Sequence, residues 1–228
     1  MQITVAEALG ALTDVEEKNA PKTLYFQGNR EILSHGSRVS VVGSRKASAE
    51  GLKRARALSR ALVDHGVVVV SGLAEGIDTA AHTSAIEAGG ETVAVIGTPL
   101  DTYYPKENQA LQRLMEREQL VITQFPIGSA VTQKNFPIRN RTMALLTDAT
   151  VIVEAGEKSG TVHQGWEALR LGRQLFLLES VANDESLSWP AKMIHYGAHV
   201  LSRDNLDEML SDIPAVTRRY EKGLADYF

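Results

Sequence analysis

Residues 67–97 read VVVVSGLAEGIDTAAHTSAIEAGGETVAVIG. Four consecutive valines end at a Ser-Gly turn, a segment with a helical pattern follows from Ile77 to Ala88, and a second apolar run covers Thr92 to Ile96. Nearly continuous runs of β-branched residues indicate strands that are buried on both faces, as in a parallel sheet covered by helices. The stretch therefore predicts a strand, a helix and a second parallel strand.

The same alternation continues on both sides of this stretch. The other predicted strands are Val39–Val42, Leu120–Thr123, Thr150–Val153 and Leu175–Leu178, with a possible edge strand at Val200. The other predicted helices are Ser48–Asp64, Asn108–Arg117, Phe136–Leu146 and Val162–Leu171. We expect an α/β fold with a doubly wound, mostly parallel sheet and helices on both faces.

Three parts are expected along the chain. Residues 1–29 are predicted to form a short helical lead-in, residues 30–203 the sheet domain, and residues 204–228 a last helix and a charged tail.

The composition fits an ordinary globular protein: 228 residues, 43% hydrophobic and 23% charged, with a mean hydropathy of −0.14. The absence of cysteine excludes disulfides, thiolate nucleophiles and Cys-ligated metals. Because there is neither a membrane-length apolar run nor a signal peptide, we expect a soluble, cytoplasmic protein without membrane contact. We also expect no metal and no cofactor.

Basic residues are unevenly distributed. The formal net charge is −4, yet residues 30–60 carry eight basic and two acidic residues, among them Arg45 and Lys46. A second basic island holds Lys134, Arg139 and Arg141. An acidic protein with such islands can bind a polyanion through one face.

Glycine follows one predicted strand after another. Ligands of open α/β sheets bind at the carboxyl ends of the strands, where glycine lets backbone approach a ligand and a helix start offers N–H groups to phosphate. The turns predict a phosphate-binding rim, although each glycine alone could simply shape a tight turn. They are Gly43-Ser44-Arg45, Ser71-Gly72 to Gly76, Gly97-Thr98, and Gly156 with Ser159-Gly160-Thr161.

Phe136-Pro137-Ile138-Arg139-Asn140-Arg141 is the second candidate motif. Phe136 offers a ring on which a base could stack, and the two arginines could reach phosphates. A core phenylalanine followed by solvated arginines is the equally simple structural alternative.

Several other site types do not fit. The turn GSRKASAEG lacks the G-x-G-x-x-G spacing of dinucleotide-binding proteins, and no P-loop or G-x-S-x-G motif is present. The six histidines show no metal-binding spacing.

With these residues in hand, the chain resembles the DNA processing protein A (DprA/Smf) family. The matching phrases are VVGSRKAS at 41–48, VVVVSGLAEGIDTAAHTSAIEAGGETVAVIGTPLDTYYPKEN at 67–108, FPIRNR at 136–141 and VIVEAGEKSGT at 151–161. LYFQGN at 24–29 also resembles a strand of the family. The family phrase SGLARGID has Glu75 here, which reverses a charge at the rim.

The resemblance implies an extended Rossmann-like domain that binds single-stranded DNA in a basic pocket, loads RecA, acts in DNA uptake and natural transformation, and forms a homodimer. Gly43, Ser44 and Arg45 would contact phosphate, and Phe136 would meet a base. The full set of predicted DNA- or phosphate-binding residues is Gly43, Ser44, Arg45, Lys46, Gly72, Gly97, Lys134, Phe136, Arg139, Asn140, Arg141, Ser159, Gly160 and Thr161.

Two alternatives remain open. One is a nucleoside-monophosphate N-glycosidase of a related superfamily, in which Gln164 stands at the position of the catalytic glutamate and Glu167 would have to replace it. The other is a sensor that binds one small nucleotide at the same rim.

Overall fold

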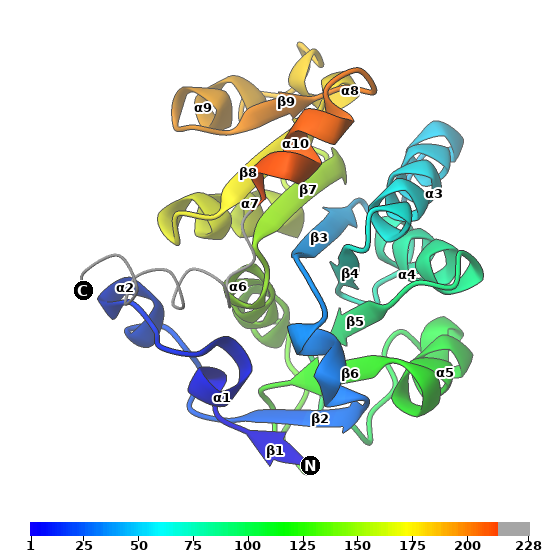
Figure 1. Ribbon diagram of the computed structural model, residues 1–228, viewed down its shortest axis with the longest axis vertical. Coiled ribbons are helices and arrows are strands. Elements are labelled where there is room, and N and C mark those ends of the chain that lie inside the picture. Colours follow the sequence, from blue (N-terminus) through cyan, green and yellow to red (C-terminus); the bar gives the residue numbers. More distant parts are fainter. Residues whose placement is uncertain (214–228) are drawn as a thin grey trace.

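The computed structural model describes residues 1–213. Within these residues, nine strands form one sheet in the order β1-β2-β6-β5-β4-β3-β7-β8-β9, and the strands from β3 to β9 pair in parallel (Figure 1). The strands are β1 (Gln2–Ile3), β2 (Leu24–Gly28), β3 (Arg38–Gly43), β4 (Val68–Ser71), β5 (Thr92–Val95), β6 (Leu120–Thr123), β7 (Ala149–Glu154), β8 (Gln174–Leu178) and β9 (His199–Leu201). The expected doubly wound, mostly parallel α/β sheet is confirmed.

Helices cover both faces of the sheet. In Figure 1, α3, α4 and α5 lie on one side of the column of strands and α1, α2, α6 and α7 on the other. The helices are α1 (Val5–Leu9), α2 (Asp14–Glu17), η1 (Arg30–Ser34), α3 (Ala49–Asp64), α4 (Ile77–Glu87), η2 (Lys106–Asn108), α5 (Gln109–Glu118), α6 (Asn135–Leu146), α7 (Gly160–Arg170), α8 (Glu179–Ala182), α9 (Pro190–His195) and α10 (Leu206–Asp212).

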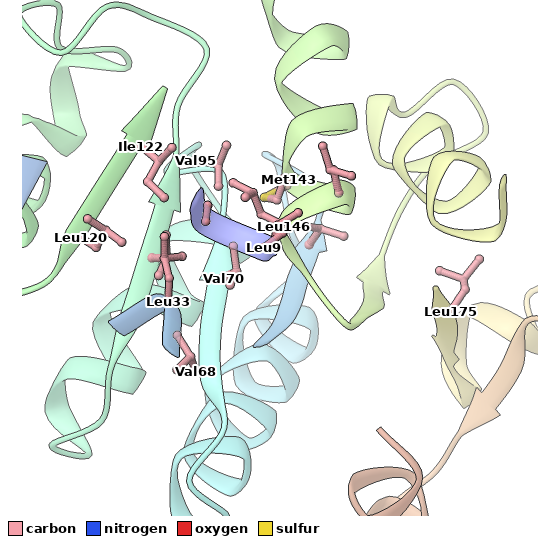
Figure 2. Packing of buried hydrophobic residues seen from close by; sticks show 14 of the residues in the cluster. Leu9, Leu33, Val68, Val70, Val95, Leu120, Ile122, Met143, Leu146 and Leu175 are labelled. Carbon is pink, nitrogen blue, oxygen red and sulfur yellow. The ribbon is translucent and has the colours of Figure 1, made fainter. Parts of the chain in front are cut away.

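The valine runs supply both faces of the sheet because side chains alternate along a strand. Val69 packs in the cluster beneath α3 and α4, whereas Val68 and Val70 pack in the cluster on the opposite face. Figure 2 shows this cluster on the opposite face, in which Val70 and Val95 lie toward Met143 of α6 and Val68 lies beside Leu33. Burial on both faces accounts for the absence of polar residues in these runs.

Strand β3 is the point where the strand order reverses. It pairs with β4 on one side and β7 on the other, so the chain leaves the carboxyl end of β3 toward β4 and leaves that of β7 in the opposite direction, toward β8. This geometry opens a crevice at the ends of β3 and β7, the usual ligand position in open α/β sheets.

The expectation of a helical lead-in over residues 1–29 is wrong in part. Thr4 with Glu7, and Thr13 with Glu16, form two capping boxes, which start two short helices rather than one. Strands β1 and β2 flank them, and β2 pairs antiparallel with β6, so the segment extends the central sheet. The stretch 24–29 is a strand, as the resemblance implied.

A buried ion pair anchors the lead-in. Glu16 of α2 accepts a hydrogen bond from Arg173, directly before β8, and both side chains are at most 3% exposed. At the same end of the sheet, the Arg38 backbone N–H donates to Asp148 over 2.7 Å. Charges buried this deeply are stable only when paired, so the lead-in and the sheet depend on one another.

The expected last helix is present as α10, and Met209 and Ile213 are buried against the sheet. The predicted tail, with Tyr220, Leu224, Tyr227 and Phe228, lies outside the described residues. Among residues 1–213, no helix is long and apolar enough to cross a membrane, and no three His, Asp or Glu side chains gather as metal ligands.

Candidate functional site

A cleft of about 270 Å³ lies at the carboxyl ends of β3 and β7, between α4, α6 and α7. The residues around it come from the end of β3, from the turns after β3, β4 and β7, and from the three helices. They are Val42, Gly43, Arg45, Ala74, Asp78, Phe136, Pro137, Arg139, Asn140, Met143, Ser159, Gly160, Thr161 and Gln164.

Arg45 is the exposed cation of the cleft. Its guanidinium lies 5.2 Å from the centroid of the Phe136 ring, a cation–π distance. The Phe136 ring also lies beside the Tyr104 ring, and the two ring centroids are 5.3 Å apart. Within residues 1–213 Arg45 has no ion pair, so its charge is available to an anion.

Arg139 is buried rather than free at the surface, with 5% of its area exposed. Its Nη1 donates a 2.9 Å hydrogen bond to the Val95 carbonyl at the end of β5. The guanidinium fits beneath Gly72, where any Cβ would collide with it. Gly72 is therefore required by the packing of Arg139, a reason different from ligand approach.

Asp78 holds the turn that covers Arg139. Its Oδ2 accepts hydrogen bonds from the backbone N–H groups of Gly72 (3.1 Å) and Ala74 (3.3 Å). Burial raises the pKa of the Asp78 carboxyl, opposed chiefly by the charge of Arg139. Burial also lowers the pKa of the Arg139 guanidinium, and the nearby Arg45 lowers it further. The floor of the cleft thus holds two desolvated groups that affect each other's pKa.

The start of α7 forms the opposite wall. Thr161 Oγ1 donates to the Gly43 carbonyl over 3.2 Å, and Asn140 Nδ2 donates to the Gly160 carbonyl over 3.2 Å. These bonds join α7 to the turn after β3 and to α6. Gly160 itself is exposed at the cleft.

A second cavity of about 160 Å³ adjoins the cleft and shares Arg45, Ala74, Phe136 and Arg139 with it. Gly97 lies against the Phe136 ring, where an added Cβ would approach ring carbon Cδ1 to 2.9 Å. The other residues around this cavity are Gly72, Glu75, Tyr104 and Pro105.

The structure separates the predicted site residues into three groups. Those at the cleft are Gly43, Arg45, Phe136, Arg139, Asn140, Ser159, Gly160 and Thr161. Those at the second cavity are Gly72 and Gly97, together with the shared Arg45, Phe136 and Arg139. Those that line neither are Ser44, Lys46, Lys134 and Arg141.

The side chains that correspond to the catalytic region of the N-glycosidase alternative make other contacts in this structure. Glu167 pairs with Arg141 (3.2 Å) and Arg170 (2.7 Å) and does not line the cleft. Gln164 lines it, but its Nε2 donates to Ser40 Oγ over 3.1 Å. Glu154 accepts from the Ser48 backbone N–H over 2.9 Å and so caps the start of α3.

Several residues that line the cleft or the second cavity were not among the predicted site residues. Asp78 and Tyr104 carried no signal of their own, because one acidic residue in a helix start or one tyrosine in a loop is common. Glu75 was singled out only as a charge reversal, and the structure places it at the second cavity.

A larger hollow of about 850 Å³ lies apart from the cleft, between α3, α8 and α10. Leu58, Leu178 and Leu201 are among the residues that line it.

Comparisons with known proteins agree with one another. Residues 9–214 match the family model described as DNA recombination-mediator protein A. Protein Smf of Synechocystis sp. is 36% identical over 213 residues, which is 92% of this chain and 54% of that protein. DNA processing protein DprA of Streptococcus pneumoniae is 37% identical over 184 residues, which is 81% and 64% of the two chains. The chain thus spans between about half and two thirds of these relatives.

Solved structures give the same result. The X-ray structure of S. pneumoniae DprA has a TM-score of 0.80 at 31% identity, covering 94% of this chain and 74% of that one. DNA processing protein A of Helicobacter pylori, a structure described for its single-stranded DNA binding mode, has a TM-score of 0.77 at 25% identity and covers 93% and 94%. A molybdenum cofactor binding protein from Rippkaea orientalis shares the fold alone, with a TM-score of 0.56 at 20% identity, covering 78% and 96%.

Proposed function

The chain belongs to the DNA recombination-mediator protein A family, and on that premise we propose that its cleft binds the backbone and bases of single-stranded DNA. The observation that carries the proposal is the Arg45–Phe136 pair at the strand-order reversal. The guanidinium attracts a phosphate while the ring stacks on a base, the combination typical of proteins that bind single strands.

In this proposal the cleft binds the strand and does not catalyse a reaction. Its carboxylate, Asp78, is occupied by two backbone N–H groups, and Glu167 is paired outside. Among the described residues, both of these carboxylates are therefore already engaged in other contacts.

The family match is the ground for proposing a mediator role. We propose that the bound strand is handed to a RecA-type recombinase in the cytoplasm, in DNA uptake and natural transformation, and that the protein acts as a homodimer. The first point is tested by the rate of RecA assembly on a strand coated with single-strand-binding protein, which we expect the protein to increase. Light scattering at micromolar concentration tests the second.

DNA binding is tested by fluorescence anisotropy with a labelled single strand of mixed sequence. We expect wild-type protein to bind it, Arg45→Glu to lose most of the affinity, and Phe136→Ala to weaken binding by about 1–3 kcal/mol. Lys18→Glu, an exposed cation of the lead-in, is the charge-matched control and should bind normally.

Absence of binding by folded wild-type protein at low salt would refute the proposal. Equal loss in Lys18→Glu and Arg45→Glu would mean that overall charge, not the cleft, binds the strand.

A further inference from the structure

The second cavity has the walls of a site for a single base. Tyr104 is 46% exposed, and its ring lies 5.3 Å from Phe136 at an interplanar angle of 45°. Aromatic rings at the rim of a single-strand site provide stacking surfaces for bases. The volume of about 160 Å³ equals roughly five water molecules, which suits one base rather than a base pair.

Glu75 lines the same cavity as these rings and lies on the turn between β4 and α4. It is exposed, and within residues 1–213 it makes no hydrogen bond or ion pair. An ionised carboxylate only accepts hydrogen bonds. It therefore favours a base edge that carries an amino group and disfavours one that presents a carbonyl oxygen at the same place.

The two walls are fixed relative to each other. Asn108, shortly after Tyr104, donates from Nδ2 to the Leu73 carbonyl (2.9 Å) and to Thr79 Oγ1 (2.8 Å). These contacts clamp the turn that carries Glu75 against the loop that carries Tyr104. A cavity with rigid walls loses little conformational entropy on binding and can discriminate between similar ligands.

We propose that this cavity is a base-reading subsite, in which Tyr104 stacks on one base of the strand and Glu75 accepts a hydrogen bond from its exocyclic amino group. The subsite rests on the proposed binding of single-stranded DNA and adds a base preference to it. Cytosine, adenine and guanine satisfy the carboxylate, whereas thymine and uracil present carbonyl oxygens to it.

The test compares short oligomers of deoxycytidine and deoxyuridine, whose bases differ at C4, an amino group against a carbonyl oxygen, and at N3, which carries a proton only in uracil. We expect wild-type protein to bind oligo-dC at least about fivefold more tightly than oligo-dU. In Glu75→Ala this ratio should fall to about one, although loss of a negative charge raises both affinities. Tyr104→Ala should weaken binding of both oligomers roughly tenfold.

Glu107→Ala is the matched control, because Glu107 is an exposed carboxylate nearby that does not line the cavity. It should leave the dC to dU ratio unchanged. Equal ratios in wild type and Glu75→Ala would overturn the subsite while leaving DNA binding intact. Failure of the wild type to bind either oligomer would instead refute the proposed function.

Discussion

At the scale of single residues, burial decides what each charge can do. Arg45 and Arg139 both line the cleft, yet one is exposed and the other has a hydrogen bond to Val95 beneath Gly72. The sequence predicted both arginines as phosphate ligands because it shows that they are basic. It could not show that Gly72, distant in the chain, leaves the space in which Arg139 is buried.

Replacing Gly72 tests this packing. Gly72→Ala should displace the Arg139 guanidinium from its bond to Val95 and lower the free energy of unfolding by about 1–3 kcal/mol, the range for an extra methyl group forced into a filled space. Gly156→Ala, with no atom near its added Cβ, is the control and should be nearly neutral. Equal urea midpoints for the two variants would contradict the prediction.

His82 links stability to pH. It is fully buried, its Nδ1 lies 2.7 Å from Thr92 Oγ1, and desolvation by burial lowers its pKa to about 3 from 6.5. The unfolded chain therefore binds a proton below pH 6.5 that the folded chain rejects, so stability falls as the pH falls from 6.5 toward 3.

Between pH 7 and pH 5 this effect amounts to about 2 kcal/mol. Urea unfolding across that range should show a smaller decrease in His82→Gln than in the wild type. Parallel pH profiles of the two proteins would rule out the buried neutral histidine.

At the scale of elements, the predictions are confirmed for β3 to β8 and for α3 to α7, because each of these segments contributes apolar side chains to a buried cluster. The elements of the lead-in, residues 1–29, are harder to predict. Strand β1 has two residues, and α1 and α2 have five and four, too few for a period to be visible. Their capping boxes were the available signal.

A carboxylate from strand β7 holds the start of helix α3. Ser48 caps the helix, and Glu154 at the end of β7 accepts the Ser48 backbone N–H. Glu154→Ala and Ser48→Ala should each cost about 1 kcal/mol of stability. The double variant should cost less than the sum, because both remove one connected unit. Strict additivity in the double-mutant cycle would mean that the two residues act independently.

At the scale of the whole molecule, the site is assembled from turns far apart in the sequence, and its position could be predicted because parallel strands bring their carboxyl ends to one edge. The buried ion pair that holds the lead-in to the sheet could not be predicted. Glu16 and Arg173 carry no mutual signal in the sequence, yet they form a buried pair between the lead-in and β8.

Removing this pair should weaken the whole fold. Glu16→Ala leaves Arg173 buried without that partner, so we expect a loss of about 3–5 kcal/mol in thermal or urea unfolding. The adjacent Glu17→Ala changes an exposed carboxylate and should have little effect. Similar stabilities for the two variants would show that the pair contributes little.

The most direct test of single-strand binding in the cleft is the salt dependence of affinity for a single-stranded oligomer. Each phosphate contact contributes a slope of about −0.7 to log affinity against log salt concentration. We expect Arg45→Ala to reduce the wild-type slope by about one such contact, with Lys18→Ala unchanged. An unchanged slope in Arg45→Ala would contradict a phosphate contact at the cleft.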